Sequence, residues 1–213
     1  MQKLNWHTEV LTDSQLSVLK SLGPVAKNLD FYLAGGTAAA LYLGHRCSAD
    51  LDWFTPEKLK DPLGLTRELE SKGMEVKVKE FSRGTLHCMI KGVRVSFLEY
   101  LYPLLLPLVP CDAFGCLAAP LEDIACMKLV AIAQRGFKKD FLDIYAICKN
   151  YKPLSELLEL SRKKFALDDL SSILYGLTYF EDADRERAPK VLWRMDWRKV
   201  KAEIGEWVRE LVG

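Results

Sequence analysis

Two aspartates, Asp50 and Asp52, have the spacing that two ligands of one metal ion need. They flank Leu51 in a short apolar segment, and residues two apart in a strand share a face. Two carboxylates on one face repel each other unless a cation lies between them, and hard oxygen ligands favour Mg²⁺ or Mn²⁺. The pair therefore predicts a divalent-metal site suited to transfer chemistry on a nucleoside triphosphate (NTP).

A glycine turn precedes the two aspartates. Residues 31–34 are apolar and aromatic, as in a buried strand, and Gly35 and Gly36 follow directly. We expect Thr37 to be the N-cap of a short alanine-rich helix that ends at Gly44. A helix N-terminus presents free N–H groups and the positive end of its dipole, so we expect this turn to bind phosphate.

Each motif also has an ordinary explanation. Two glycines before a threonine commonly form a turn and a cap, and two aspartates in a strand are commonly a surface pair. Arg46 and Ser48, in the loop before the aspartates, could lie near the metal, or they could cap or bridge that loop. The functional hypothesis depends on the two motifs occurring together and in this order.

The order strand, Gly-Gly-Thr, helix and Asp-x-Asp strand resembles the signature of the DNA polymerase β-like nucleotidyltransferases. The string LAGGTAAALYLGHRCSADLDWF is similar to the AbiEii-type toxin branch, found in type IV toxin–antitoxin systems. The likeness continues to the C-terminal string LTYFEDADRERAPKVLWRMDWRKVK and includes a basic and acidic pattern formed by Lys128, Arg135, Lys138, Lys139, Asp140 and Asp143.

The resemblance implies a role for most of these residues. Lys128 and Lys139 would bind triphosphate or substrate, and Asp140 would orient a basic group or act as an auxiliary acid or base. The NTP would lie over the glycine turn, and the acceptor would be RNA, such as a tRNA end, or a protein side chain. An antitoxin partner is also implied. Without the resemblance, the same charges would be ordinary surface charges and a favourable first-turn acid.

The polymerase β-like enzymes usually place a third carboxylate on a strand beside the pair, and here that position is Ser96. Serine cannot replace a carboxylate as base or metal ligand. The nearest acid, Glu99, has the opposite strand parity. Three hypotheses therefore stay open: an active nucleotidyltransferase, a catalytically impaired nucleotide-binding protein, and an interaction module that keeps only the fold.

The remaining sequence predicts an α+β fold, in which a mixed sheet with flanking helices is followed by a C-terminal helical region, and the resemblance implies that this sheet is the minimal nucleotidyltransferase one. Alternating or apolar runs predict strands at 74–81, 85–90 and 93–100, beside the segments at 31–34 and 50–54. Helical patterns occupy 13–27, 62–72, 120–134, 138–149, 154–165, 167–179 and 197–212. We expect an α/β core over 1–118 and a helical region over 119–213 that completes the active-site cleft.

Composition excludes several function classes. The chain has 213 residues, 49% of them hydrophobic, and a formal net charge of +1, so no global basic field indicates nucleic-acid binding. The six cysteines form no Cys-x-x-Cys pair, which suggests reduced thiols in a cytoplasmic protein. No apolar run has the length of a membrane span, so we expect no membrane partner.

Overall fold

A mixed sheet forms the centre of the computed structural model, which describes residues 5–213. Across these residues the sheet has seven strands in the order β3-β4-β5-β2-β1-β7-β6. The β2–β5 and β1–β7 pairs are parallel and the others antiparallel, as a mixed sheet requires. The strands are β1 (Tyr32–Ala34), β2 (Asp50–Thr55), β3 (Val76–Ser82), β4 (Thr85–Ile90), β5 (Val93–Glu99), β6 (Val109–Cys111) and β7 (Cys116–Ala118).

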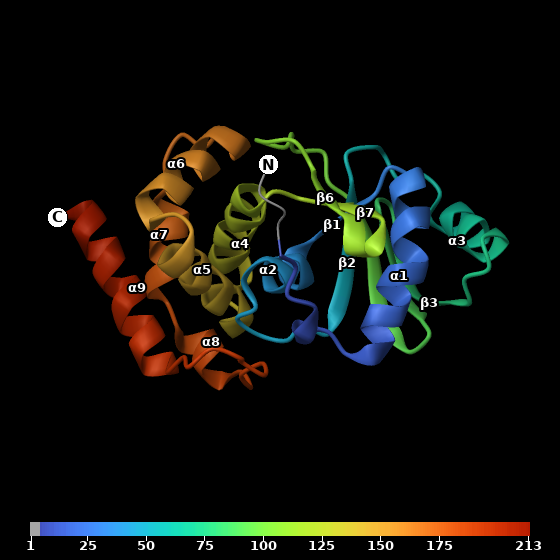
Figure 1. Ribbon diagram of the computed structural model, residues 1–213. Coiled ribbons are helices and arrows are strands. Elements are labelled where there is room, and N and C mark those ends of the chain that lie inside the picture. The colour runs from blue at the N-terminus through green and yellow to red at the C-terminus, as the bar shows by residue number, and fades with distance from the viewer. Residues whose placement is uncertain (1–4) are drawn as a thin grey trace.

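Helices cover the sheet and then form a separate layer of their own. In Figure 1, α1 and α3 lie on one side of the sheet, and the later helices gather on the other side beyond α2. The α-helices are α1 (Asp13–Asn28), α2 (Gly35–Leu43), α3 (Pro62–Ser71), α4 (Leu121–Arg135), α5 (Lys138–Asn150), α6 (Leu154–Phe165), α7 (Ser171–Thr178), α8 (Glu181–Arg185) and α9 (Trp197–Val212). The α+β class predicted from the sequence is confirmed.

Two apolar clusters fill the molecule. The first lies between the sheet and α1–α3, and its largest fully buried side chain is Trp53 on β2. The second lies among α4–α9 and includes Phe141 of α5. Helix α4 contributes to both, because Ile124 packs in the first cluster and Leu129 in the second. This shared helix joins the sheet to the helical region through continuous apolar contact.

Local signals explain where several elements begin and end. Thr12 and Gln15 form a capping box at the start of α1. Gly44 ends α2 in the left-handed conformation, at φ +66°. The strands at 50–55, 85–90 and 93–99 follow the predicted runs closely.

Four elements differ from the sequence prediction. Strands β6 and β7 have three residues each, too few to give an alternating pattern, and they follow a segment interrupted by prolines. Helix α8 is a helix of five residues at a position that no predicted helix covers. Helix α7 begins at Ser171, four residues later than predicted, because residues 167–170 form an irregular connection.

Candidate active site

The glycine turn lies directly against the aspartate pair. Gly35 has φ +66°, and a Cβ built there would lie 2.7 Å from Asp52 Oδ2. A Cβ on Gly36 would lie 2.7 Å from Arg46 Nη2. A side chain of any size at either position would displace the neighbouring carboxylate or guanidinium. Glycine is therefore required at both positions, because these charged groups pack directly against the backbone. The first also needs the left-handed conformation that glycine adopts most easily.

Thr37 does not cap α2, so that expectation is wrong. The helix begins at Gly35 with Ala34 as its N-cap, because the chain turns immediately after β1. Thr37 is therefore inside the first turn and fully buried, where its hydroxyl donates a hydrogen bond to the carbonyl oxygen of Asp50. Its side chain ties the start of α2 to the strand that carries both aspartates.

Asp50 and Asp52 share one face of β2, while Leu51 between them is fully buried on the other. Both carboxylates line a cavity of about 800 Å³ between the sheet and the helical region. Burial raises the pKa of Asp52; a hydrogen bond from Ser96 opposes this shift, and the nearby charge of Asp50 adds to it. Asp50 Oδ1 lies 2.7 Å from Nε of the exposed Arg94, yet the buried oxygen accepts no hydrogen bond from the described residues.

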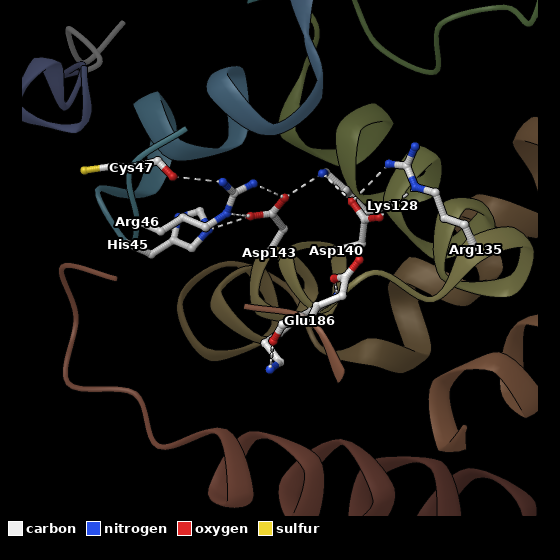
Figure 2. Close-up of polar contacts among 9 residues, drawn as sticks. His45, Arg46, Cys47, Lys128, Arg135, Asp140, Asp143 and Glu186 are labelled. Atoms are coloured by element: carbon white, nitrogen blue, oxygen red, sulfur yellow. Dashed lines mark hydrogen bonds and ion pairs between the residues drawn. The ribbon is translucent and has the colours of Figure 1, made fainter. Parts of the chain in front are cut away.

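A buried ionic network (Figure 2) contributes Arg46 and Lys128 to the wall of the same cavity. Asp143 of α5 is fully buried, and its two oxygens accept hydrogen bonds from Arg46 Nε at 2.6 Å and Nη2 at 2.8 Å. Lys128 Nζ lies 2.6 Å from Asp143 Oδ2 and 2.7 Å from Asp140 Oδ1. Burial alone would raise the pKa of Asp143, but Arg46 and Lys128 hold it well below its usual value. These carboxylates therefore fix the two cations in place.

The loop before the aspartates is also fixed by the C-terminal part of the chain. His45 Nε2 lies 2.7 Å from Asp143 Oδ1, and burial lowers the pKa of this imidazole. The backbone N–H of Cys47 donates to the carbonyl of Lys190, and the N–H of Leu192 donates to the carbonyl of His45, both at 2.8 Å. These bonds join the loop to a segment almost 150 positions later in the chain.

The cavity brings together most residues that the sequence singled out, whereas Thr37 and Asp140 lie behind its wall. Asp140 holds Lys128 and also accepts a hydrogen bond from Arg135 Nε at 3.0 Å. Lys139 lines the cavity, and no carboxylate of residues 5–213 pairs with its ammonium, which lies 5.8 Å from the Phe137 ring centroid. The residues named from the sequence that line the cavity are Gly35, Gly36, Arg46, Ser48, Asp50, Asp52, Ser96, Lys128, Arg135 and Lys139.

The sequence did not single out several other residues of the wall. His87 of β4 faces the cavity, and its parity on the strand is the signal that could have indicated this. Tyr100, Tyr102 and Phe165 form an aromatic end of the cavity, with ring centroids 5.4 and 5.0 Å apart for successive pairs. No local pattern could join these rings, because they come from an irregular segment and a distant helix end.

Comparison with known proteins decides the family. A family model described as nucleotidyl transferase AbiEii toxin, type IV TA system, matches residues 17–208. The chain belongs to this AbiEii family. One curated relative, the uncharacterized protein aq_aa25 of Aquifex aeolicus (strain VF5), is 45% identical to this AbiEii family member over 159 residues, which is 74% of this chain and 77% of the relative.

Two solved structures share the fold of this AbiEii family member. JHP933 from Helicobacter pylori gives a TM-score of 0.55 at 21% identity, over 94% of this chain and 93% of that chain. MenT4, the nucleotidyltransferase toxin Rv2826c from Mycobacterium tuberculosis H37Rv, gives a TM-score of 0.53 at 14% identity, over 96% of this chain and 87% of that chain. At these identities the likeness establishes the nucleotidyltransferase fold.

The donor set of this AbiEii family member fits a hard divalent cation. Asp50 and Asp52 offer carboxylate oxygens on one face, and Asp50 Oδ1, which lies 2.7 Å from Arg94 Nε, accepts no hydrogen bond from the described residues. Within residues 5–213, no group of three or more His, Cys, Asp or Glu side chains is placed to hold a metal ion. Mg²⁺ commonly binds one or two carboxylates and completes its shell with water and substrate phosphates. The pair therefore fits a metal that is shared with a nucleotide.

The predicted position of the third carboxylate is beside the pair and is occupied by serine. Ser96 of β5 is the cross-strand partner of Asp52. Glu99 points elsewhere, because its Oε2 accepts a hydrogen bond from the backbone N–H of Leu59 at 2.9 Å. This carboxylate is not part of the cavity wall formed by the described residues.

The described part of the chain also contains no helix long and apolar enough to cross a lipid bilayer.

Proposed function

We propose that this AbiEii family member is a Mg²⁺-dependent nucleotidyltransferase that moves a nucleotide from an NTP to a hydroxyl group of RNA or protein. The observation that supports this most strongly is one cavity lined by two carboxylates from one face of β2, by the glycines at a helix N-terminus and by two lysines. Carboxylates alone would repel an anionic substrate. Their combination with fixed cations suits a triphosphate that arrives with a divalent metal.

In this proposal the triphosphate lies over Gly35 and Gly36, where the N-terminus of α2 contributes its dipole. Arg46 and Lys128 supply positive charge from fixed positions, since Asp143 and Asp140 hold them through short ion pairs. Lys139 supplies a cation that is free to pair with phosphate. Bound to Asp50 and Asp52, Mg²⁺ would neutralise phosphate charge during transfer.

The proposed reaction is an in-line displacement at the α-phosphorus. The acceptor hydroxyl oxygen forms a bond to this phosphorus while the bond to the bridging oxygen breaks and pyrophosphate leaves. The cations of the cavity lower the barrier because they are already oriented where negative charge develops. Ser48 lines the same cavity and can donate a hydrogen bond to a phosphate oxygen.

The biological setting of the proposal comes from the family. A type IV toxin–antitoxin family implies an antitoxin partner for this chain, and the similarity to the toxin MenT4 supports a role as toxin. We infer that the acceptor is RNA, such as a tRNA end, or a protein side chain. In this proposal residues 1–118 form the nucleotidyltransferase core and residues 119–213 complete the cleft.

A second candidate is a nucleotide-binding protein with impaired chemistry, and Ser96 is the observation that favours it. A serine hydroxyl cannot take the place of a carboxylate base. Binding of NTP without turnover would distinguish this candidate from the active enzyme. A pure interaction module, the third hypothesis, would neither bind nor turn over nucleotide.

The decisive experiment is calorimetric titration of each of the four ribonucleoside triphosphates, with and without Mg²⁺, into the wild-type chain. The matched variant replaces both aspartates by asparagine (Asp50→Asn with Asp52→Asn), which keeps size and removes charge. We expect Mg²⁺-dependent binding that the variant loses while its thermal unfolding stays cooperative. Equal binding by the variant would sink the proposed site, and absence of binding by the wild type would favour the interaction module.

A further inference from the structure

One row of side chains runs across three neighbouring strands on the face of the sheet that borders the cavity. Asp52 of β2 is the partner of Ser96 on β5, and Ser96 is the partner of His87 on β4. Ser96 Oγ lies 3.1 Å from His87 Nδ1, and the Ser96 hydroxyl lowers the pKa of the neighbouring Asp52. All three side chains line the cavity. The row therefore links an imidazole to the aspartate pair through one hydroxyl group.

The proposed transfer requires a group that accepts the proton of the attacking hydroxyl. Near neutral pH, the side chains that accept protons are carboxylates and imidazoles. Of the described residues that line the cavity, Asp50, Asp52 and His87 are those that meet this requirement. The proposed function assigns the two aspartates to the metal, so His87 is the remaining candidate proton acceptor among these residues. Glu99 is already engaged by the backbone of Leu59.

We propose that His87, acting through Ser96, takes the proton from the acceptor hydroxyl during nucleotidyl transfer. The inference rests on the function proposed above and deepens it, because it makes the serine part of a working relay. The acceptor oxygen bonds to the α-phosphorus and gives its proton to Ser96 Oγ, while Ser96 passes its own proton to His87 Nδ1. The electron pair of the broken phosphorus–oxygen bond leaves with pyrophosphate.

The hydrogen-bonding capacity of serine suits this relay. A hydroxyl donates one hydrogen bond and accepts up to two, so the Ser96 proton faces either Asp52 or His87. His87 Nδ1 lies within hydrogen-bond distance of Ser96 Oγ, at 3.1 Å, and Asp52 is the cross-strand neighbour of Ser96 on the other side. In this arrangement Ser96 contacts the acceptor, and His87 is the positioning residue behind it.

The test compares His87→Gln, Ser96→Ala, Ser96→Asp and the double variant His87→Gln with Ser96→Asp. Two readouts are needed: calorimetric NTP binding with Mg²⁺, and transfer of α-phosphate radiolabel to the RNA and protein of a heat-treated bacterial extract. We expect His87→Gln to slow transfer about a hundredfold and to bind NTP like wild type. The double variant should recover most of the loss, because a carboxylate at Ser96 accepts the proton directly.

The chain offers a matched control in His7→Gln, since His7 lies outside the cavity wall and pairs with Glu9 at 2.7 Å. Its transfer rate should stay unchanged.

A third readout needs neither metal nor nucleotide. Nitrogen NMR of the His87 ring should show a shifted Nδ1 signal in Ser96→Ala, because the 3.1 Å contact is lost.

The outcomes separate the relay from the function on which it rests. Normal transfer by His87→Gln, failure of the double variant to recover, or an unchanged Nδ1 signal would overturn the relay and leave the nucleotidyltransferase intact. Wild type that binds NTP without transfer would overturn the relay and support the impaired-enzyme candidate. Wild type that binds no NTP would overturn both.

Discussion

Asp143 binds both nitrogens on one edge of the Arg46 guanidinium, across 97 positions of sequence. The same carboxylate holds His45 and Lys128, so one residue of α5 fixes side chains from two other segments. A carboxylate that is buried without such partners would be strongly destabilising. With them, it holds the loop before the aspartate pair against the helical region, and so connects the stability of the molecule with the geometry of its candidate site.

Replacing Asp143 by asparagine should therefore lower the free energy of unfolding by about 3–5 kcal/mol, because it leaves buried cations uncompensated. Urea denaturation at neutral pH measures this. The pKa of Asp143 is depressed in the folded state, so its contribution is present above the ordinary aspartate pKa of about 4 and is lost as pH falls through the lower folded value. The difference in the free energy of unfolding between the Asp143→Asn variant and the wild type should therefore become smaller as the pH is lowered.

An exposed ion pair supplies the control for that measurement. Glu156 pairs with Lys152 at 3.3 Å on the surface of α6, and Glu156→Gln should cost less than about 1 kcal/mol. Equal losses in the Asp143 and Glu156 variants would contradict the structural role assigned to the buried network.

Gly35→Ala should damage nucleotide binding through two separate effects. Alanine is strained at φ +66°, and its Cβ would lie 2.7 Å from the Asp52 carboxylate, which must then move. We expect NTP affinity in the presence of Mg²⁺ to fall more than about tenfold, or about 1.4 kcal/mol, as measured by calorimetry.

The variant Gly73→Ala separates the effect of backbone strain at positive φ from the effect of a Cβ that collides with a neighbouring side chain. Gly73 also has positive φ, at +81°, but a Cβ there would meet nothing within 4 Å. This variant should lose about 1 kcal/mol of stability and bind NTP normally. If it impaired binding as much as Gly35→Ala does, close approach to Asp52 would not be the cause.

Lys139→Ala and Lys128→Ala should have different consequences, although both lysines line the cavity. Lys128 is buried between two carboxylates, so its loss should destabilise the fold by several kcal/mol, about 3–5. Lys139 has no such pairing within residues 5–213, so its loss should leave stability within about 0.5 kcal/mol and weaken triphosphate binding about tenfold. Thermal unfolding and calorimetry separate the two effects. Wild-type affinity in Lys139→Ala would remove this residue from the proposed triphosphate site.

The local half of the candidate site could be predicted from sequence because its rules have short range. The period of two in a strand places Asp50 and Asp52 on one face, and the same rule places Ser96 on the cavity side of β5. The turn could also be predicted locally, because Gly35 and Gly36 directly follow a short apolar strand segment. The predicted resemblance to the AbiEii family is confirmed by the family model, which spans residues 17–208.

The long-range half could not be predicted in this way. Nothing near Arg46 in the sequence indicates that its partner is Asp143, since the pairing depends on how α5 packs against α2. Threonine is a residue type typical of helix N-caps, but in the folded chain the Thr37 hydroxyl donates a hydrogen bond to the carbonyl oxygen of Asp50 instead. His87 gains its place only through the pairing of β4 with β5.

The backbone bonds between His45–Cys47 and Lys190–Leu192 have a consequence for synthesis of the chain. A ribosome makes the glycine turn and both aspartates long before Lys190 and Leu192, which are backbone partners of the loop that precedes the aspartates. The loop that carries Arg46 therefore lacks these backbone partners while the chain is nascent. The loop beside the cavity therefore reaches its final set of backbone bonds only after residues 190–192 have been synthesised and have paired with it.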